Sequence, residues 1–327
     1  MAIKSMIDAI REAIREEMER DHSVFILGED IGKRGGVFLA TDGLLEEFGE
    51  SRVIDTPLAE SSICGIALGA AMQGQRPIAE IEFADFIWPA INQIVGEAAR
   101  ARYGSKGTIQ VPMVVRSPYG GGVRGGLYHS QSVESFFAHT PGLIVVAPAT
   151  PYDAKGLLKE SIRSNDPVIF LEHKRAYRLV RGEVPDGDYS IPIGQAEVKL
   201  SGNSLTCVSY GLMLHHCLEA ARTVAAENIS VEVLDLRTIR PLDKEAVLTS
   251  VKKTSRLIIV HEDTKLFGIG AEVSALVAEE GFDFLDAPIM RIAGPEIPAM
   301  PFSPTLEDKF LPNPGTIADA FRTLSKY

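Results

Sequence analysis

Short apolar runs alternate with longer helical patterns along the whole chain, and this alternation constrains the fold more than any other feature. Parallel strands need crossover connections, which are usually helices that cover the faces of the sheet. The first half is therefore predicted to form a parallel α/β sheet with helices on both faces. The expected strands are residues 24–27, 77–83, 111–116, 143–147 and 168–171, and the expected helices are residues 5–20, 61–73, 85–103 and 152–164.

The ends of these elements carry local signals. Ser5 followed by Asp8 predicts the start of the first helix, because such a pair satisfies two free backbone N–H groups. Pro89 is compatible with helix 85–103 only in its first turn or two. The proline-punctuated tail, residues 294–314, is expected to lie extended rather than to form a helix.

A second alternation follows residues 180–194, a stretch with two prolines and three glycines that reads as a linker. A length of 327 residues at roughly 150 residues per domain also predicts about two domains. We place them at residues 1–185 and 195–327. In the second, the expected strands are residues 205–210, 231–236 and 257–260, and the expected helices are residues 213–226, 243–252 and 270–280.

Composition excludes several classes of protein. The 33 basic and 44 acidic side chains give a net charge of −11, which disfavours nucleic-acid binding. No apolar run reaches the roughly 18 residues of a membrane-spanning helix, and the acid-rich residues 1–21 do not resemble a signal or transit peptide. Three cysteines without a Cys-x-x-Cys spacing argue against a zinc site or disulfide scaffold, so a cytoplasmic location is expected.

Two groups of residues are candidates for chemistry. His129 follows the glycine cluster 120–126, which predicts a mobile loop of the kind that carries reactive groups, although a lone histidine is more often only a satisfied polar group. Glu29, Asp30 and Glu60 follow predicted strands, where the ligand crevice of a parallel sheet lies. Helix capping is the alternative for these acids, since they favour helix N-termini. No His-Glu-x-x-His or Gly-x-Ser-x-Gly motif is present.

Several motifs together resemble one family. They are GEDIG at 28–32, DTPLAE at 55–60, FADF at 83–86, YHSQS at 128–132 and DLRT at 235–238. In this order they are similar to the beta subunit of the thiamine-diphosphate-dependent decarboxylating component of 2-oxo acid dehydrogenase complexes, from about residue 4 to the C-terminus. YHSQS and AGPEIP at 293–298 favour the branched-chain (2-oxoisovalerate) branch. The resemblance implies a transketolase-like fold with a pyrimidine-binding domain and a smaller C-terminal domain.

The resemblance also implies roles for individual residues. Glu60 corresponds to the glutamate that hydrogen-bonds N1′ of the cofactor's aminopyrimidine and so tunes its electronics. His129 corresponds to the histidine that assists acyl transfer to a lipoyl group, a task that suits its ordinary pKa. Phe86 corresponds to the aromatic residue stacked on the pyrimidine. Leu58 and Glu29 are further expected cofactor contacts.

Partners follow from the same resemblance. The chain lacks the Gly-Asp-Gly motif that holds Mg²⁺ and the diphosphate, so a separate alpha subunit is expected to supply it in a heterotetramer of two alpha and two beta chains. The lipoyl acyltransferase core is expected to bind through its basic subunit-binding domain. The acids expected to attract this domain are Glu279, Glu280, Asp283 and Asp286. The alternative is that they only form a solvated acidic surface with no partner.

Two departures from the family are visible. Glu82 stands where relatives often carry Gln, which adds a charge near the pocket. The loop that holds a structural K⁺ in several relatives aligns with Ser161, Ile162, Ser164 and Asp166, where Ser164 and Asp166 replace Asp and Asn. Pyruvate and acetoin enzymes, and a non-catalytic docking scaffold, remain alternatives to the branched-chain activity. The sequence does not define which 2-oxo acid is preferred.

Overall fold

The computed structural model describes residues 1–327, which divide into two units. Unit 1 contains Met1–Tyr119 and Phe136–Ile193, and unit 2 contains Gly120–Ser135 and Gly194–Tyr327. Residues 120–135 thus cluster with unit 2 although the chain on either side of them builds unit 1. The chain consequently passes from one unit to the other three times.

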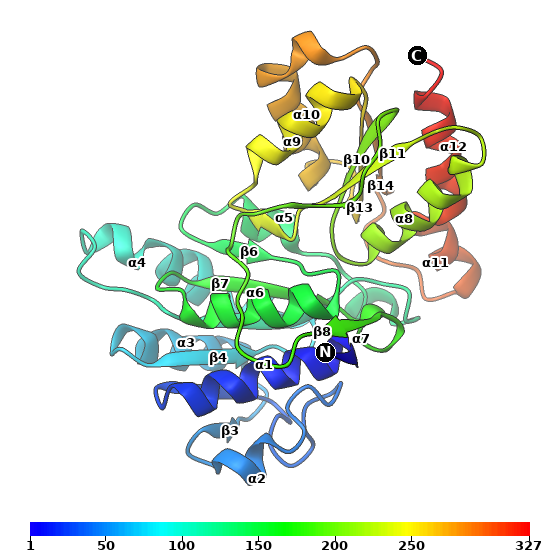
Figure 1. The fold of residues 1–327 in the computed structure, drawn as a ribbon. Coiled ribbons are helices and arrows are strands. Elements are labelled where there is room, and N and C mark those ends of the chain that lie inside the picture. Colours follow the sequence, from blue (N-terminus) through cyan, green and yellow to red (C-terminus); the bar gives the residue numbers. More distant parts are fainter. The chain divides into compact units, whose positions relative to one another are not determined.

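Unit 1 is built on six parallel strands in the order β6-β7-β5-β4-β2-β3. Helices are expected to cover both faces of a parallel sheet. In Figure 1, α1 and α6 lie side by side along the strands. The strands are β2 (Val24–Gly28), β3 (Val53–Asp55), β4 (Arg76–Glu80), β5 (Val114–Tyr119), β6 (Ile144–Val146) and β7 (Val168–His173). The main helices are α1 (Met6–Arg20), α2 (Leu44–Phe48), α3 (Glu60–Met72), α4 (Ala99–Gly104), α6 (Pro151–Arg163) and α7 (Ala176–Leu179), with α5 (Glu134–Ala138) at the unit boundary.

The first helix begins where the sequence predicts it. Ser5 and Asp8 form the full capping box, with the Ser5 hydroxyl accepting from the Asp8 N–H at 3.2 Å. The apolar side chains of Met6, Ile10, Ile14 and Met18 in this helix are 0% exposed, and the burial of each stabilises the fold by about 1.5–3 kcal/mol. Before this helix, β1 (Ala2–Ser5) pairs antiparallel with β8 (Arg181–Val184).

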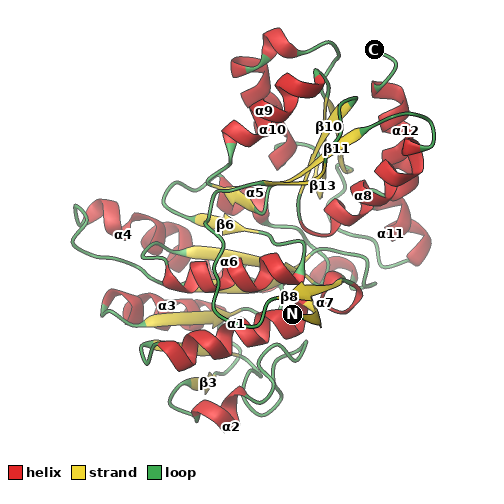
Figure 2. Cartoon of the chain, viewed as in Figure 1, coloured by secondary structure: helices red, strands yellow, loops and turns green.

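Unit 2 contains a five-stranded sheet in the order β14-β13-β10-β11-β9, in which only β9 runs antiparallel. Helices α9 and α10 lie on one side of this sheet and α8 and α12 on the other (Figures 1 and 2). The strands of this sheet are β9 (Glu197–Leu200), β10 (Leu205–Ser209), β11 (Val231–Asp235), β13 (Leu257–Thr264) and β14 (Met290–Gly294). The short strand β12 (Thr238–Arg240) is not part of it. The helices are η4 (Gly126–Tyr128), α8 (Gly211–Ala225), α9 (Lys244–Thr254), α10 (Ile269–Glu280), η5 (Phe282–Phe284), α11 (Pro304–Phe310) and α12 (Pro314–Leu324).

Two sequence expectations about helices are wrong. The tail is not fully extended, because α11 spans Pro304–Phe310. Its proline lies in the first turn, where the missing N–H costs nothing. The single helix expected over 85–103 is instead broken into η1 (Ala84–Phe86), η2 (Trp88–Ala90), the π-helix η3 (Asn92–Ala98) and α4, with Pro89 inside η2.

No helix has both the length and the apolar character needed to cross a bilayer.

Candidate active site

The strand order of unit 1 reverses between β2 and β4. From β2 the chain moves outward to the edge strand β3, whereas from β4 it continues to β5 on the other side. Ligands of open α/β sheets bind beyond the carboxyl ends of the strands at such a point. Gly28 and Glu80, the last residues of β2 and β4, are paired there. A Cβ on residue 28 would lie 2.7 Å from the Glu80 carbonyl oxygen, so the close approach of the two strands requires glycine.

Four carboxylates gather at this switch point. Glu29 and Asp30 follow β2, Glu82 follows β4, and Glu60 is the first residue of α3. Burial, followed by the neighbouring Asp30 and Glu60 charges, raises the pKa of Glu29. Burial and the charges of Glu29, Asp30 and Glu80 raise the pKa of Glu82 to about 7. The structure therefore brings three of the sequence-predicted acids into one electrostatic group, together with Glu82.

Glu60 is half-buried and its carboxylate makes no hydrogen bond or ion pair within the chain. The preceding N-cap residue, Ala59, contributes no side-chain cap either. No hydrogen bond caps the helix through Glu60, but as the first residue of α3 its carboxylate lies where the helix dipole favours an acid, so this alternative stays open beside the ligand role. A carboxylate held among like charges without an internal donor is well suited to accept a hydrogen bond from an external group.

The apolar candidates flank this region. Phe86 lies in η1 and packs edge-on against Phe83, with ring centroids 5.6 Å apart. The next short helix, η2, packs against α3, which begins at Glu60. Leu58, in the turn between β3 and α3, is 70% exposed. Both apolar side chains are thus on segments that follow the carboxyl ends of strands, with Leu58 exposed and Phe86 half-buried.

A buried charged network under the switch point escaped the sequence analysis. Arg116 on β5 is 1% exposed and donates to both oxygens of Glu172 on β7, each at 2.7 Å. It also donates to Glu80 at the end of β4, and the Tyr177 hydroxyl donates to Glu172 at 2.6 Å. Burial raises the pKa of Glu80 and of Tyr177, while the Arg116 charge opposes both shifts. The only sequence signal was one charged residue at each of three predicted strands: Glu80 within 77–83, Arg116 at the end of 111–116, and Glu172 directly after 168–171.

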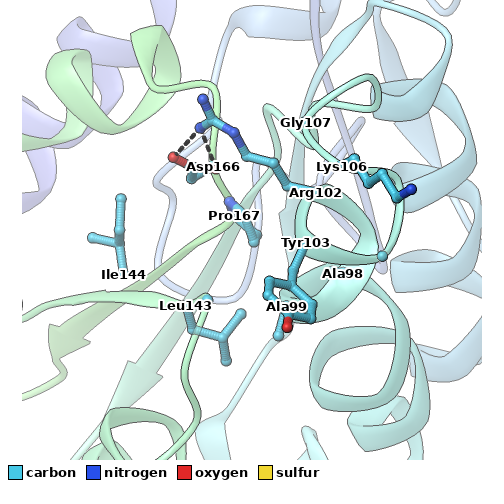
Figure 3. A pocket seen from close by; sticks show the side chains of 12 residues that line it. Ala98, Ala99, Arg102, Tyr103, Lys106, Gly107, Leu143, Ile144, Asp166 and Pro167 are labelled. Carbon is cyan, nitrogen blue, oxygen red and sulfur yellow. Dashed lines mark hydrogen bonds and ion pairs between the residues drawn. The ribbon is translucent and has the colours of Figure 1, made fainter.

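The loop aligned with a potassium site already contains a positive charge. Nη1 of Arg76 donates to the carbonyl oxygens of Ile162 at 2.9 Å and Ser164 at 2.8 Å. The Ser161 hydroxyl donates back to its own helix, and the Asp166 carboxylate pairs with Arg102 at 2.6 Å. That ion pair lies at an open pocket of about 890 Å³ (Figure 3).

His129 belongs to unit 2, whereas the carboxylate group lies in unit 1. It follows η4 and is half-buried. A backbone hydrogen bond of 3.0 Å from Gly120 N–H to the Gln131 carbonyl closes the glycine-rich segment around it. The loop that the sequence predicts is present, and it is held by unit 2.

The acids expected to dock the acyltransferase are all exposed in unit 2. Glu279 and Glu280 end α10, Asp283 lies in η5, and Asp286 follows it. Glu280 forms an ion pair with Lys244 at 2.6 Å, which neutralises its charge. The negative charge of this surface therefore comes from the other three acids.

The chain matches two family models over nearly its whole length. Residues 3–180 match the transketolase pyrimidine-binding domain and residues 194–317 match the transketolase C-terminal domain. A split-gene transketolase, an inactive beta4 tetramer, has the same fold with a TM-score of 0.81 at 22% identity, covering 98% of each chain.

Curated relatives are similar over their full length. The chain is 57% identical to the 2-oxoisovalerate dehydrogenase subunit beta of Bacillus subtilis, over 100% of both chains. It is 46% identical to the pyruvate dehydrogenase E1 component subunit beta of the same organism, again over 100% of both, and 46% identical to that of Staphylococcus aureus, over 98% of both. The predicted transketolase-like α/β fold is confirmed, and the chain belongs to the family of 2-oxo acid dehydrogenase beta subunits built from the two transketolase domains.

Proposed function

We propose that this chain is the beta subunit of a branched-chain 2-oxo acid dehydrogenase that uses thiamine diphosphate and passes the acyl group to a lipoyl acyltransferase. The observation that carries the proposal is the unpaired, half-buried carboxylate of Glu60 at the switch point of the sheet. The 57% identity to a 2-oxoisovalerate dehydrogenase subunit supports the choice of substrate class.

The residues of unit 1 fit an aminopyrimidine. When bound, thiamine diphosphate supplies the electron sink for decarboxylation of a 2-oxo acid. Glu60 would accept a hydrogen bond from the ring nitrogen N1′ of the bound group, because its carboxylate has no competing donor within the chain. Phe86, from η1, and Leu58, from the turn before α3, would line the aminopyrimidine ring.

The chain supplies only part of the site. We propose that Mg²⁺ and the diphosphate are held by an alpha subunit; in this chain no three or more His, Cys, Asp or Glu side chains are grouped so that they could hold a metal ion. We propose an assembly of two alpha and two beta chains in the cytoplasm. His129 donates the proton needed when the lipoyl group accepts the acyl chain, and the acidic surface of unit 2 steers the basic docking domain of the acyltransferase.

Potassium binding stays a prediction. The carbonyl oxygens of Ile162 and Ser164 each keep a second lone pair beside the Arg76 hydrogen bond. A potassium ion would therefore share these oxygens with a guanidinium of the same sign of charge. We propose that this repulsion makes the site weak.

The test of the proposal is Glu60→Gln in the enzyme reconstituted with its alpha chain. The amide cannot hold a proton on N1′ as the carboxylate does, so decarboxylation of 2-oxoisovalerate should fall at least 100-fold while the tetramer still forms. Glu46→Gln is the matched control, because Glu46 is also an acid in the first turn of a helix but is exposed. Undiminished decarboxylation in Glu60→Gln would remove the proposed role.

The substrate alternatives are tested on the wild-type assembly. The branched-chain proposal requires a higher kcat/KM for 2-oxoisovalerate than for pyruvate or acetoin. The opposite order would assign the chain to one of those enzymes. Absence of turnover with all three in a correctly assembled tetramer would support the docking scaffold.

A further inference from the structure

The glycine-rich segment that carries His129 is fastened by buried carboxylates of unit 2. The N–H of Gly121 donates to Oε1 of Glu262. The N–H groups of Gly122 and Arg124 both donate to Oε1 of Glu307, at 2.8 and 3.3 Å. Two carboxylates from distant parts of the sequence thus hold three amides within four residues of loop.

Glu307 is committed to this loop. Its side chain is 0% exposed, and its second oxygen accepts from Nη1 of Arg124 at 2.5 Å. Every hydrogen bond that its carboxylate accepts comes from residues 122–124. A buried carboxylate is costly unless its lone pairs are filled, so Glu307 and the loop require one another.

The backbone that these bonds hold is not intrinsically favourable. Gly122 has φ +78° and Arg124 has φ +60°, both left-handed, and the second is uncommon for a residue with a Cβ. Such a conformation persists only where the surroundings determine it. Here the hydrogen bonds from the N–H groups of Gly122 and Arg124 to one oxygen of Glu307 hold the backbone in this conformation.

Packing supports the same arrangement. A Cβ on residue 121 would lie 2.7 Å from Cε of Met300, and one on Gly126 would lie 3.1 Å from the Phe302 ring. The chain just before α11 therefore lies directly against the loop. Beyond the loop, in α5, the Ser135 hydroxyl donates to Asp263 at 2.5 Å, so the segment that follows the loop is also held by unit 2.

We propose that Glu307 is a positioning residue, which fixes the 120–131 loop so that His129 is held in one place for acyl transfer. This inference rests on the role proposed above for His129. Glu307 lies in the C-terminal domain, 178 positions after His129. It acts on acyl transfer only through the position of the histidine. Glu262 contributes the same kind of support at Gly121.

The anchoring part is tested by hydrogen exchange of the loop in the assembled enzyme. Because hydrogen bonds to a charged acceptor are strong, Glu307→Ala should speed exchange of peptides within 120–131 by about 10- to 100-fold and accelerate tryptic cleavage after Arg124. Glu307→Gln keeps an oxygen acceptor and should give a smaller rise. Asp308→Ala is the matched control, since Asp308 also pairs with Arg124 but is 61% exposed; it should change exchange less than about 2-fold.

The positioning part is tested by a double-mutant cycle with His129→Ala. Decarboxylation is followed with an artificial electron acceptor, and acyl transfer is followed on a lipoyl domain. Glu307→Ala should slow acyl transfer about 10-fold or more and leave decarboxylation within about 2-fold. The Glu307→Ala, His129→Ala double variant should transfer no more slowly than His129→Ala alone, because Glu307 acts only through the histidine.

Each contrary result has a distinct meaning. Loop exchange that is unchanged in Glu307→Ala overturns the anchoring, and losses that multiply in the double variant overturn action through His129. If His129→Ala itself leaves acyl transfer unchanged, the proposed role of His129 fails and the positioning proposal falls with it. In that case a loss of decarboxylation in Glu60→Gln still upholds the proposed function of the chain.

Discussion

Replacing Arg116 by methionine removes the only cation from the buried network under the switch point. The substitution keeps most of the aliphatic volume of the side chain but leaves Glu80 and Glu172 without their shared donor. Both carboxylates are almost fully shielded from water, at 5% and 0% side-chain exposure. Two like charges would then face each other in the interior of unit 1.

The size of the effect follows from burial. Removing one partner of a buried ion pair typically costs about 3–5 kcal/mol, because the remaining charge is desolvated and unpaired. For a unit of this size that corresponds to a fall in Tm of about 6–20 °C. The matched control is Arg102→Met, which breaks an Arg–Asp pair with similar N–O distances whose side chains are 48% and 37% exposed; it should cost less than about 1 kcal/mol.

The sole tryptophan provides a local assay. Trp88 packs against Phe136 within unit 1, with ring centroids 4.9 Å apart, so its fluorescence follows unfolding of this unit in urea. Loss of the Arg116 charge removes an influence that lowers the pKa of Glu80. A carboxyl whose pKa is raised on folding gives stability that is complete at low pH and is lost as pH rises through the folded value. The deficit of Arg116→Met should therefore shrink as the pH is lowered from 8 towards 5.

Two outcomes would refute this reasoning. Equal destabilisation by Arg116→Met and Arg102→Met would show that burial does not set the cost. A triple variant that also carries Glu80→Gln and Glu172→Gln should recover much of the stability, since no unpaired charge remains. No recovery would show that the loss comes from packing and not from charge.

The other predictions concern Glu82 and the potassium loop. The pKa of Glu82 is raised from 4.5 to about 7, so the stability of unit 1 should fall as pH rises from 4.5 to about 7 and should fall less in Glu82→Gln, as measured by urea titration of Trp88 fluorescence. Equal pH profiles would contradict the shift. For the Arg76-occupied loop, replacing choline chloride by KCl at equal ionic strength should raise Tm by less than about 1 °C. A rise of several degrees would show tight binding of K⁺.

Local rules predicted much of the fold from the sequence. The Ser5–Asp8 pair defined the start of α1, because a capping box depends only on residues three apart. The acids after β2 and β3 could be placed at one edge of the sheet, because all parallel strands end there. Their approach to one another then followed from the strand order.

The missed features depend on contacts between distant segments. From the sequence alone, a charged side chain in a buried strand has no visible partner. The pairing of Arg116 with Glu80 and Glu172 follows only once β5 is known to lie between β4 and β7. Likewise, nothing near Gly122 indicates that its N–H meets Glu307, since 185 residues separate them. The helix α11 was missed because the prolines of the tail were interpreted as breakers and not as first-turn residues.

The three passages of the chain between the units limit how the protein can be divided. A fragment that starts at Gly194 would contain Glu262 and Glu307 but not the amides of Gly121, Gly122 and Arg124 that fill their lone pairs. An acceptor that stays buried without its donor would cost that fragment about 1–3 kcal/mol. A fragment with residues 120–135 grafted back should therefore be more stable than one without them, which makes the linker after residue 185 a poor place to cut.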